Sequence, residues 1–85
     1  MKKVKFKQRV YNYTVIFEPA KEGGYVVYVP ALPGCLTQGD NFEEAEVMVK
    51  DAIKEYLKAM KDLKEDIPIE PEKTIISRVP VKISF

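Results

Sequence analysis

Hydrophobic and polar positions in the first third of the chain follow the pattern typical of β-strands. In RVYNYTVIFE (residues 9–18), aromatic and β-branched residues occupy both sides of an extended chain. YVVYV (residues 25–29) has the same character. Between the two runs, Pro19 cannot continue a hydrogen-bonded ladder, and Gly23 and Gly24 can adopt positive φ. The pattern therefore predicts a β-hairpin.

A tight turn and a short strand follow the hairpin. The sequence LPGC (residues 32–35) has proline at its second position and glycine at its third, which is typical of a type II turn. We expect a third strand at about residues 35–38, with Gly39 and Asp40 leading from it into a helix.

The start and the end of this helix are both marked in the sequence. Asn41 is a favourable N-cap, and Glu44 three residues further on completes the pattern of a capping box. The helix is predicted to run to about Lys64, because Pro68 and Pro71 prevent its continuation. Its apolar positions recur at helical spacing: Ala45, Met48, Val49, Ala52, Ile53, Tyr56, Leu57, Met60 and Leu63.

The end of the chain, TIISRVPVKISF, returns to β character. Val81, Ile83 and Phe85 alternate with polar residues, and Pro80 is compatible only with an edge strand or a bulge. The expected fold class is α+β, with the order β-β-β-α-β and one long helix on one face of an antiparallel sheet. With 85 residues, the chain has room for a single domain, residues 1–85.

The predicted sheet has more apolar residues than one helix can cover. Tyr25, Val27 and Val29 lie on one face of the second strand, and Val26 and Tyr28 lie on the other. A monomer rarely exposes a continuous apolar patch larger than a few hundred Å². We therefore expect self-association or a partner protein, unless the twist of the sheet hides these side chains internally.

Composition excludes several kinds of site and of location. The chain has no histidine and one cysteine, so it can form neither an internal disulfide nor an ordinary zinc site. A lone cysteine fits the cytoplasm, and we find no signal peptide and no apolar run that could span a membrane. The net charge of +1 gives no overall attraction to nucleic acid, and the high lysine and glutamate content suggests a thermophile.

Two candidates for catalytic chemistry are weak. Cys35 lacks a histidine to activate it and is better explained as a small buried hydrophobic residue. Carboxylates at Glu18, Asp40, Glu43 and Glu44 could in principle bind a divalent metal, as in a metal-dependent nuclease, but turn and capping roles explain them. We therefore predict no catalytic residue, no metal site and no cofactor.

The basic N-terminus supports a different hypothesis. Alternation in KKVKFKQR places Lys3, Lys5, Lys7 and Arg9 on one side of a strand, where they could contact RNA phosphates. Charged residues on an edge strand more often prevent aggregation. A stand-alone oligomeric RNA-binding module is therefore retained as an alternative function.

Residues 13–57 resemble the HicB antitoxin family. The resemblance rests on a Gly-Gly-Tyr hairpin, a Pro-x-Leu-Pro-Gly-Cys segment, a Gly-Asp pair before the helix, and Glu-Glu-Ala at its start. The matching positions are Gly23, Gly24, Tyr25, Pro30, Leu32, Pro33, Gly34, Cys35, Gly39, Asp40, Glu43, Glu44 and Ala45. Asn41 stands where the family usually has threonine, and both residues can cap a helix.

The resemblance implies a partial RNase H-like fold and a type II toxin–antitoxin pair. Its expected partner is a small HicA-like toxin, an mRNA-cleaving ribonuclease that the antitoxin would occlude. The chain is expected to be a short form without the C-terminal DNA-binding domain, so DNA binding by the chain alone is not expected. A homodimer or higher homo-oligomer is expected, with the terminal strand serving dimerisation. The predicted partner interface comprises Tyr28, Glu43, Glu46, Asp51, Glu55, Val81, Ile83 and Phe85.

Overall fold

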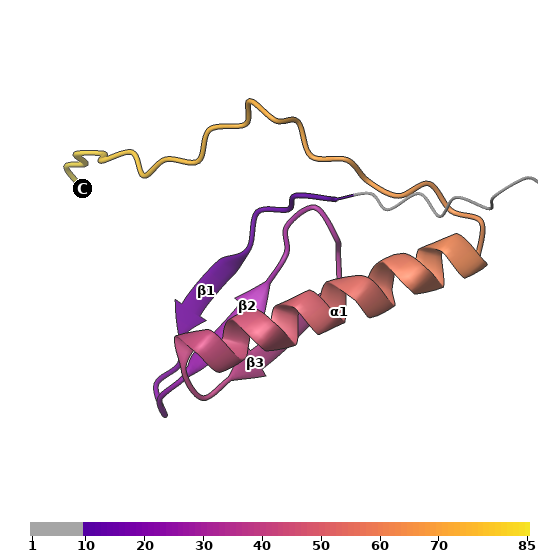
Figure 1. Ribbon diagram of the computed structural model, residues 1–85. Helices are drawn as coiled ribbons and strands as arrows, with labels where there is room; N and C mark the ends of the chain where they lie inside the picture. Colours follow the sequence, from indigo (N-terminus) through magenta and orange to yellow (C-terminus); the bar gives the residue numbers. More distant parts are fainter. Residues whose placement is uncertain (1–9) are drawn as a thin grey trace, which may run out of the picture.

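The computed structural model describes residues 10–85, and in this range it shows a three-stranded antiparallel sheet followed by one long helix (Figure 1). The elements are β1 (Ile16–Pro19), β2 (Tyr25–Tyr28), β3 (Leu36–Gly39) and α1 (Phe42–Asp62). The strands lie in the order β1-β2-β3, and both pairs are antiparallel. The α+β fold class is therefore confirmed.

The first strand is shorter than the sequence predicts. β1 begins at Ile16 rather than at residue 9, and it includes Pro19 at its end. Its partner β2 has four residues, with Ile16 paired to Tyr28, so the residues before Ile16 find no ladder partner on β2. Proline is tolerated in β1 because this strand lies at the edge of the sheet.

The predicted turn between β2 and β3 is confirmed. The Cys35 amide donates a hydrogen bond to the Leu32 carbonyl at 3.0 Å, and Gly34 has a φ of 83°. A type II turn requires positive φ at its third residue, which glycine adopts without a steric penalty. The turn buries Leu32 and Cys35, which are 1% and 4% exposed, against the helix side of the sheet.

The predicted helix start is also confirmed. The Asn41 side chain accepts a hydrogen bond from the Glu44 amide at 2.8 Å, and the Glu44 carboxylate accepts one from the Asp40 amide at 3.0 Å. Two backbone N–H groups at the helix start are thereby satisfied. The helix ends at Asp62, two residues before the predicted end.

The helix end is closed by a Schellman motif. The Glu65 amide bonds to the Met60 carbonyl at 2.9 Å, and the Lys64 amide bonds to the Lys61 carbonyl at 3.0 Å. Lys64 adopts the left-handed conformation, with a φ of 57°, that glycine usually supplies at this position.

The core lies between α1 and one face of the sheet, which we call the inner face. It comprises Val27, Val29, Leu32, Cys35, Ala45 and Val49. The helix packs mainly over β3 and β2. The Tyr56 hydroxyl donates a hydrogen bond to the Pro33 carbonyl at 2.7 Å and so ties the middle of the helix to the turn before β3.

The predicted fourth strand is wrong. Residues 63–85 contain turns but no strand, so Val81, Ile83 and Phe85 have no strand partner among the described residues. A strand needs a neighbouring edge for its backbone N–H and C=O groups. Instead, the last residues form an extended segment that runs away from the body of the protein (Figure 1). We call residues 75–85 the C-terminal arm.

Candidate partner-binding surfaces

The face of the sheet opposite the helix, which we call the outer face, is partly apolar. Because side chains alternate along a strand, the outer positions are those between the buried ones. Register places Ile16, Tyr28 and Leu36 side by side across the three strands. Leu36 is 63% exposed, and Val26 in the next row is 41% exposed. The expectation of an apolar second face therefore agrees with the structure.

A second surface is acidic and lies where the β1–β2 hairpin meets the start of α1. No lysine or arginine occurs between Glu22 and Val49. The hairpin packs closely against the corner before the helix: a Cβ added at Gly24 would lie 2.4 Å from the Gly39 carbonyl oxygen. The exposed carboxylates of this surface, which we call the acidic end, are Glu18, Glu22, Asp40, Glu43, Glu44 and Glu46, and one exposed cation, Lys21, lies between the first two.

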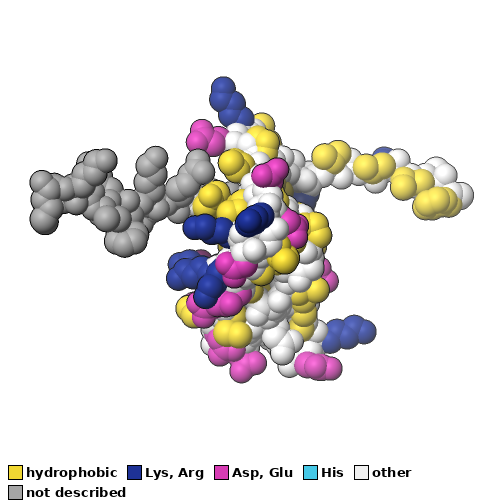
Figure 2. All heavy atoms as spheres, turned by 90° about the vertical axis from the view of Figure 1, so that its right-hand side faces the viewer, with side chains coloured by type: hydrophobic (Ala, Val, Ile, Leu, Met, Phe, Trp, Pro, Cys, Tyr) yellow, Lys and Arg dark blue, Asp and Glu magenta, His cyan; other side chains and the backbone are white. Residues whose placement is uncertain are grey.

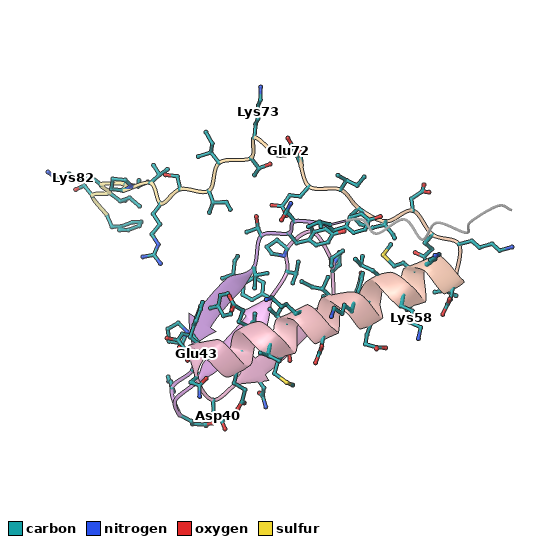
Figure 3. The ribbon with its side chains drawn as sticks, viewed as in Figure 1. Asp40, Glu43, Lys58, Glu72, Lys73 and Lys82 are labelled. Atoms are coloured by element: carbon teal, nitrogen blue, oxygen red, sulfur yellow. The ribbon has the colours of Figure 1, made fainter. Side chains whose placement is uncertain are left out.

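The start of α1 carries only acidic charges, whereas its later turns carry charges of both signs. Acidic side chains gather toward one end of the body in Figure 2, and Asp40 and Glu43 lie together at that end in Figure 3. Lysines 50, 54, 58 and 61 are all exposed on the later turns of α1, and Lys58 lies toward the opposite end of the helix (Figure 3). Carboxylates at a helix start and lysines near its end both interact favourably with the helix dipole.

The acidic part of the predicted partner interface is split by this arrangement. Glu43 and Glu46 belong to the acidic end, whereas Asp51 and Glu55 lie further along α1, interspersed with lysines. Tyr28 is half-buried on the outer face, and Val81, Ile83 and Phe85 are exposed on the arm. The predicted residues thus lie on separate surfaces.

A groove that sequence reasoning missed lies between residues 11–17 and α1. It has a volume of about 430 Å³. Its floor and walls are mainly apolar and include Val15 and Phe17 on one side and Val49, Ile53 and Leu57 on the other. Glu46, Lys50 and Lys54 also line it. The alternation of residues 11–17 indicates one wall, but the groove itself depends on where α1 crosses the sheet.

The segment after α1 is anchored beside the residues that precede β1. The Tyr13 hydroxyl donates a hydrogen bond to the Pro68 carbonyl at 2.6 Å. The Thr14 amide donates one to the Glu70 carboxylate at 2.7 Å, and the Thr14 hydroxyl donates a second. These contacts join residues more than fifty positions apart, so no local signal in the sequence predicts them.

The anchor perturbs the pKa of two side chains. Hydrogen bonds from the Thr14 hydroxyl and amide stabilise the Glu70 carboxylate and lower the pKa of Glu70 below its ordinary value. Burial raises the pKa of Tyr13, and the neighbouring Tyr11 and Glu70 raise it further. Glu70 is therefore ionised, and Tyr13 neutral, at the pH of a cell.

The motif residues shared with the HicB resemblance lie at the turns and at the corner between β3 and α1. Gly23, Gly24 and Gly34 have positive φ, and Tyr25 and Pro33 flank the hairpin and the turn. Gly39 differs, since it lies in β3 beneath the helix and not in a turn. A Cβ at Gly39 would be 2.4 Å from the Ala45 nitrogen.

The thiol of Cys35 is buried and free. Burial raises the pKa of this thiol, which disfavours the thiolate that a nucleophile requires. The carboxylates Glu18, Asp40, Glu43 and Glu44 are exposed, and within residues 10–85 no cluster of three or more histidine, cysteine, aspartate or glutamate residues could hold a metal ion.

Two further expectations concern nucleic acid and membranes. Lys3, Lys5, Lys7 and Arg9, the predicted nucleic-acid contact, lie outside the described residues, so the RNA-binding alternative stays a prediction. Within residues 10–85, no helix is both long enough and apolar enough to cross a bilayer.

The fold and its surfaces define a small α+β protein whose candidate sites are exposed surfaces and a groove. The family model for the HicB-like antitoxin of bacterial toxin–antitoxin systems matches residues 13–80. This match covers more than half of the chain, so the protein belongs to the HicB-like antitoxin family.

Curated relatives agree with this assignment. A UPF0150 protein of Thermoplasma acidophilum is 50% identical over 57 residues, which cover 67% of this chain and 83% of the relative. A UPF0150 protein of Synechocystis is 36% identical over 76 residues, covering 89% of this chain and 94% of the relative. Antitoxin HicB 1 of Photorhabdus laumondii is 52% identical over 42 residues, covering 49% of this chain and 27% of that antitoxin.

Proposed function

We propose that this protein is an antitoxin that binds a small HicA-like, mRNA-cleaving toxin and neutralises it by covering its active surface. The observation that carries the proposal is the match of residues 13–80 to the HicB-like antitoxin family. The role is one of binding and not of catalysis, and its expected location is the cytoplasm, where mRNA is translated. Self-association of the chain is part of the proposal.

The acidic end supports this proposal through its charge. A ribonuclease must bind the phosphates of its substrate and therefore needs a basic surface. Glu22 and Glu43 lie on an exposed surface that also carries Glu18, Asp40 and Glu46. Complementary charge accelerates encounter and fixes the orientation of two partners. The acidic end is therefore the proposed contact for the basic surface of the toxin.

The apolar outer face supplies a second proposed contact. Leu36 is 63% exposed and Val26 is 41% exposed, and both lie beside the half-buried Tyr28. An interface usually has an apolar centre within a polar rim. In the proposed interface with the toxin, the outer face forms the apolar centre and the acidic end forms the polar rim.

The test is co-expression with a small neighbouring gene that encodes a histidine-containing toxin. The proposed function requires that this protein restores growth and co-purifies with the toxin. The variant Glu22→Lys/Glu43→Lys is expected to weaken binding by at least about tenfold and to reduce the salt dependence of association.

The matched control is Glu55→Lys/Asp62→Lys. It makes the same change in net charge but on the later turns of α1, away from the acidic end. Binding by this control should stay within about threefold of the parent chain. No rescue and no co-purification with the neighbouring gene product would contradict the antitoxin function, and equal losses in both variants would contradict the acidic end as the contact.

A further inference from the structure

The C-terminal arm has the sequence of a strand but pairs with no strand of residues 10–85. Val81 is 73% exposed and Ile83 is 61% exposed, and Val79 and Phe85 alternate with polar residues on the same segment. Figure 2 shows the arm projecting from the body with hydrophobic side chains along it. The other side carries both cations of the arm, Arg78 and Lys82, together with Ile76 and Pro80. The arm therefore has one mainly apolar side and one mixed side that carries its positive charge.

The body carries a strand edge and an apolar groove side by side. Within residues 10–85, β1 pairs with β2 on one side only, and no described strand lies along its second edge. Along the helix side of this edge, Val15 and Phe17 form a wall of the groove described above. A strand added to the edge of β1 would place every second side chain in that groove.

The charges on the two segments agree with such pairing. Positions directly opposite each other in adjacent strands point to the same face of the sheet. When the odd-numbered residues of the arm lie opposite the odd-numbered residues of β1, Val81 and Ile83 enter the groove. Arg78 and Lys82 then lie on the outer face, the face that carries Glu18. The apolar contacts in the groove and the opposite charges on the outer face therefore both favour this pairing of odd-numbered residues.

We propose that the C-terminal arm of one copy pairs with the free edge of β1 in a second copy, so that two chains exchange arms. Val81 and Ile83 fill the partner's groove, and Lys82 lies opposite Glu18. The arrangement is reciprocal, and therefore closes into a dimer with two-fold symmetry. This interface goes beyond toxin binding and needs no toxin.

The course of the chain favours exchange over pairing within one molecule. Pro68 and Glu70 hold the root of the arm beside residues 13–14, next to the β1 edge. A turn follows, with the Thr74 amide bonded to the Pro71 carbonyl at 3.2 Å, and from it the arm leads away from its own sheet (Figure 1). Two copies with their β1 edges facing each other would place each root beside the other copy's groove.

The arm is long enough to reach a second copy. Eleven residues of extended chain span about 36 Å, while the free edge at residues 15–19 needs only about 17 Å. The remainder can bridge the distance between the two bodies. Pro80 is acceptable in this position because an edge strand leaves alternate N–H groups unpaired.

Two neighbouring substitutions test the proposal. Ile83→Glu places a carboxylate in the groove, whereas Ser84→Glu places the same group on the opposite side of the same strand. Sedimentation equilibrium of the full chain should show a dimer, and Ile83→Glu should weaken it by at least about tenfold because two buried contacts are lost per dimer. Ser84→Glu should change the dissociation constant by less than about threefold.

Both substitutions lie on the exposed arm and outside the core, so the helix signal in the circular dichroism spectrum should remain that of the parent chain. A chain that stays monomeric at about millimolar concentration would overturn the proposal, because no exchange then occurs. So would a dimer that Ile83→Glu leaves intact, since another surface would then hold it together.

Disulfide trapping distinguishes exchange from an arm that folds back on its own sheet. Glu18→Cys and Lys82→Cys are made in separate chains, each retaining the buried Cys35. Arm exchange predicts a covalent heterodimer when the two chains are mixed and oxidised, and neither chain alone should give it. In the double variant, a covalent dimer supports exchange, whereas a disulfide confined to monomers overturns it and indicates pairing within one chain.

Discussion

At the scale of single residues, Gly39 shows how closely the helix approaches the sheet. It lies at the end of β3 and is buried beneath the first turns of α1. The position of a Cβ on Gly39 is 2.4 Å from the Ala45 nitrogen and 2.6 Å from its Cα. Both atoms belong to the helix backbone and cannot rotate away as a flexible side chain can. Gly39 therefore sets the distance between α1 and β3.

Gly39→Ala is expected to destabilise the protein by about 1–3 kcal/mol, the usual cost of overpacking a core. The helix start must move away from β3, which loosens the packing of Ala45 and Val49. Urea unfolding followed by circular dichroism measures the change. Gln38→Ala is the matched control, because Gln38 is exposed on the adjacent position of β3, and its effect should stay within about 0.5 kcal/mol. An unchanged midpoint for Gly39→Ala would show that the helix can shift at no cost.

At the scale of elements, the sequence predicted the segments with strong local signals. The hairpin, the LPGC turn and the capped start of α1 are each specified by residues within about five positions of one another. The extent of β1 and the state of the last residues depend instead on distant partners. Residues 10–15 and 75–85 have β-type patterns, but neither segment pairs with a strand in the described part of the chain.

The candidate surfaces also divide into those with a local sequence signal and those that depend on distant residues. The apolar outer face was predictable because strand alternation alone places Val26 and Tyr28 opposite the core. The groove beside β1 and the anchor between Thr14 and Glu70 were not predictable. Both depend on how segments far apart in the sequence lie in space.

The anchor at Glu70 should release in acid. Two hydrogen bonds from Thr14 favour the carboxylate and lower its pKa below the ordinary value of 4.5. The stabilisation is therefore fully present above about pH 4.5 and is lost as the pH falls through the lowered pKa of the folded protein. Amide hydrogen exchange at Thr14 should accelerate in this acidic range relative to the intrinsic rate.

Glu70→Gln tests the assignment, since the amide cannot titrate. Thr14 in this variant should exchange faster than in the parent near neutral pH and show no further loss of protection on acidification. Glu72→Gln, two residues further along the same segment, should retain the acid-dependent release of the parent. A parent chain whose Thr14 protection stays constant down to the lowest pH at which the protein remains folded would contradict the role of Glu70.

At the scale of the whole molecule, the chain divides into a packed body and a segment without packing of its own. The core residues, from Val27 to Val49, lie between the sheet and α1. Beyond them the arm contributes to a radius of gyration of 17.0 Å, whereas a compact domain of 85 residues has about 12 Å. A chain this short has little apolar surface to bury alone. Arm exchange would add buried surface to both bodies at once.

Exchange of arms makes thermal stability depend on protein concentration, because association then stabilises the folded state by mass action. With an unfolding enthalpy of about 60 kcal/mol per chain, a twentyfold increase in concentration should raise Tm by about 5 °C for a dimer that dissociates as it unfolds. Ile83→Glu should remove this dependence and lower Tm toward that of the isolated body, whereas Ser84→Glu should keep it. A parent Tm that is constant over the twentyfold range would mean that the body is stable without the arm of a second copy, and that the apolar side of the arm is free for another partner.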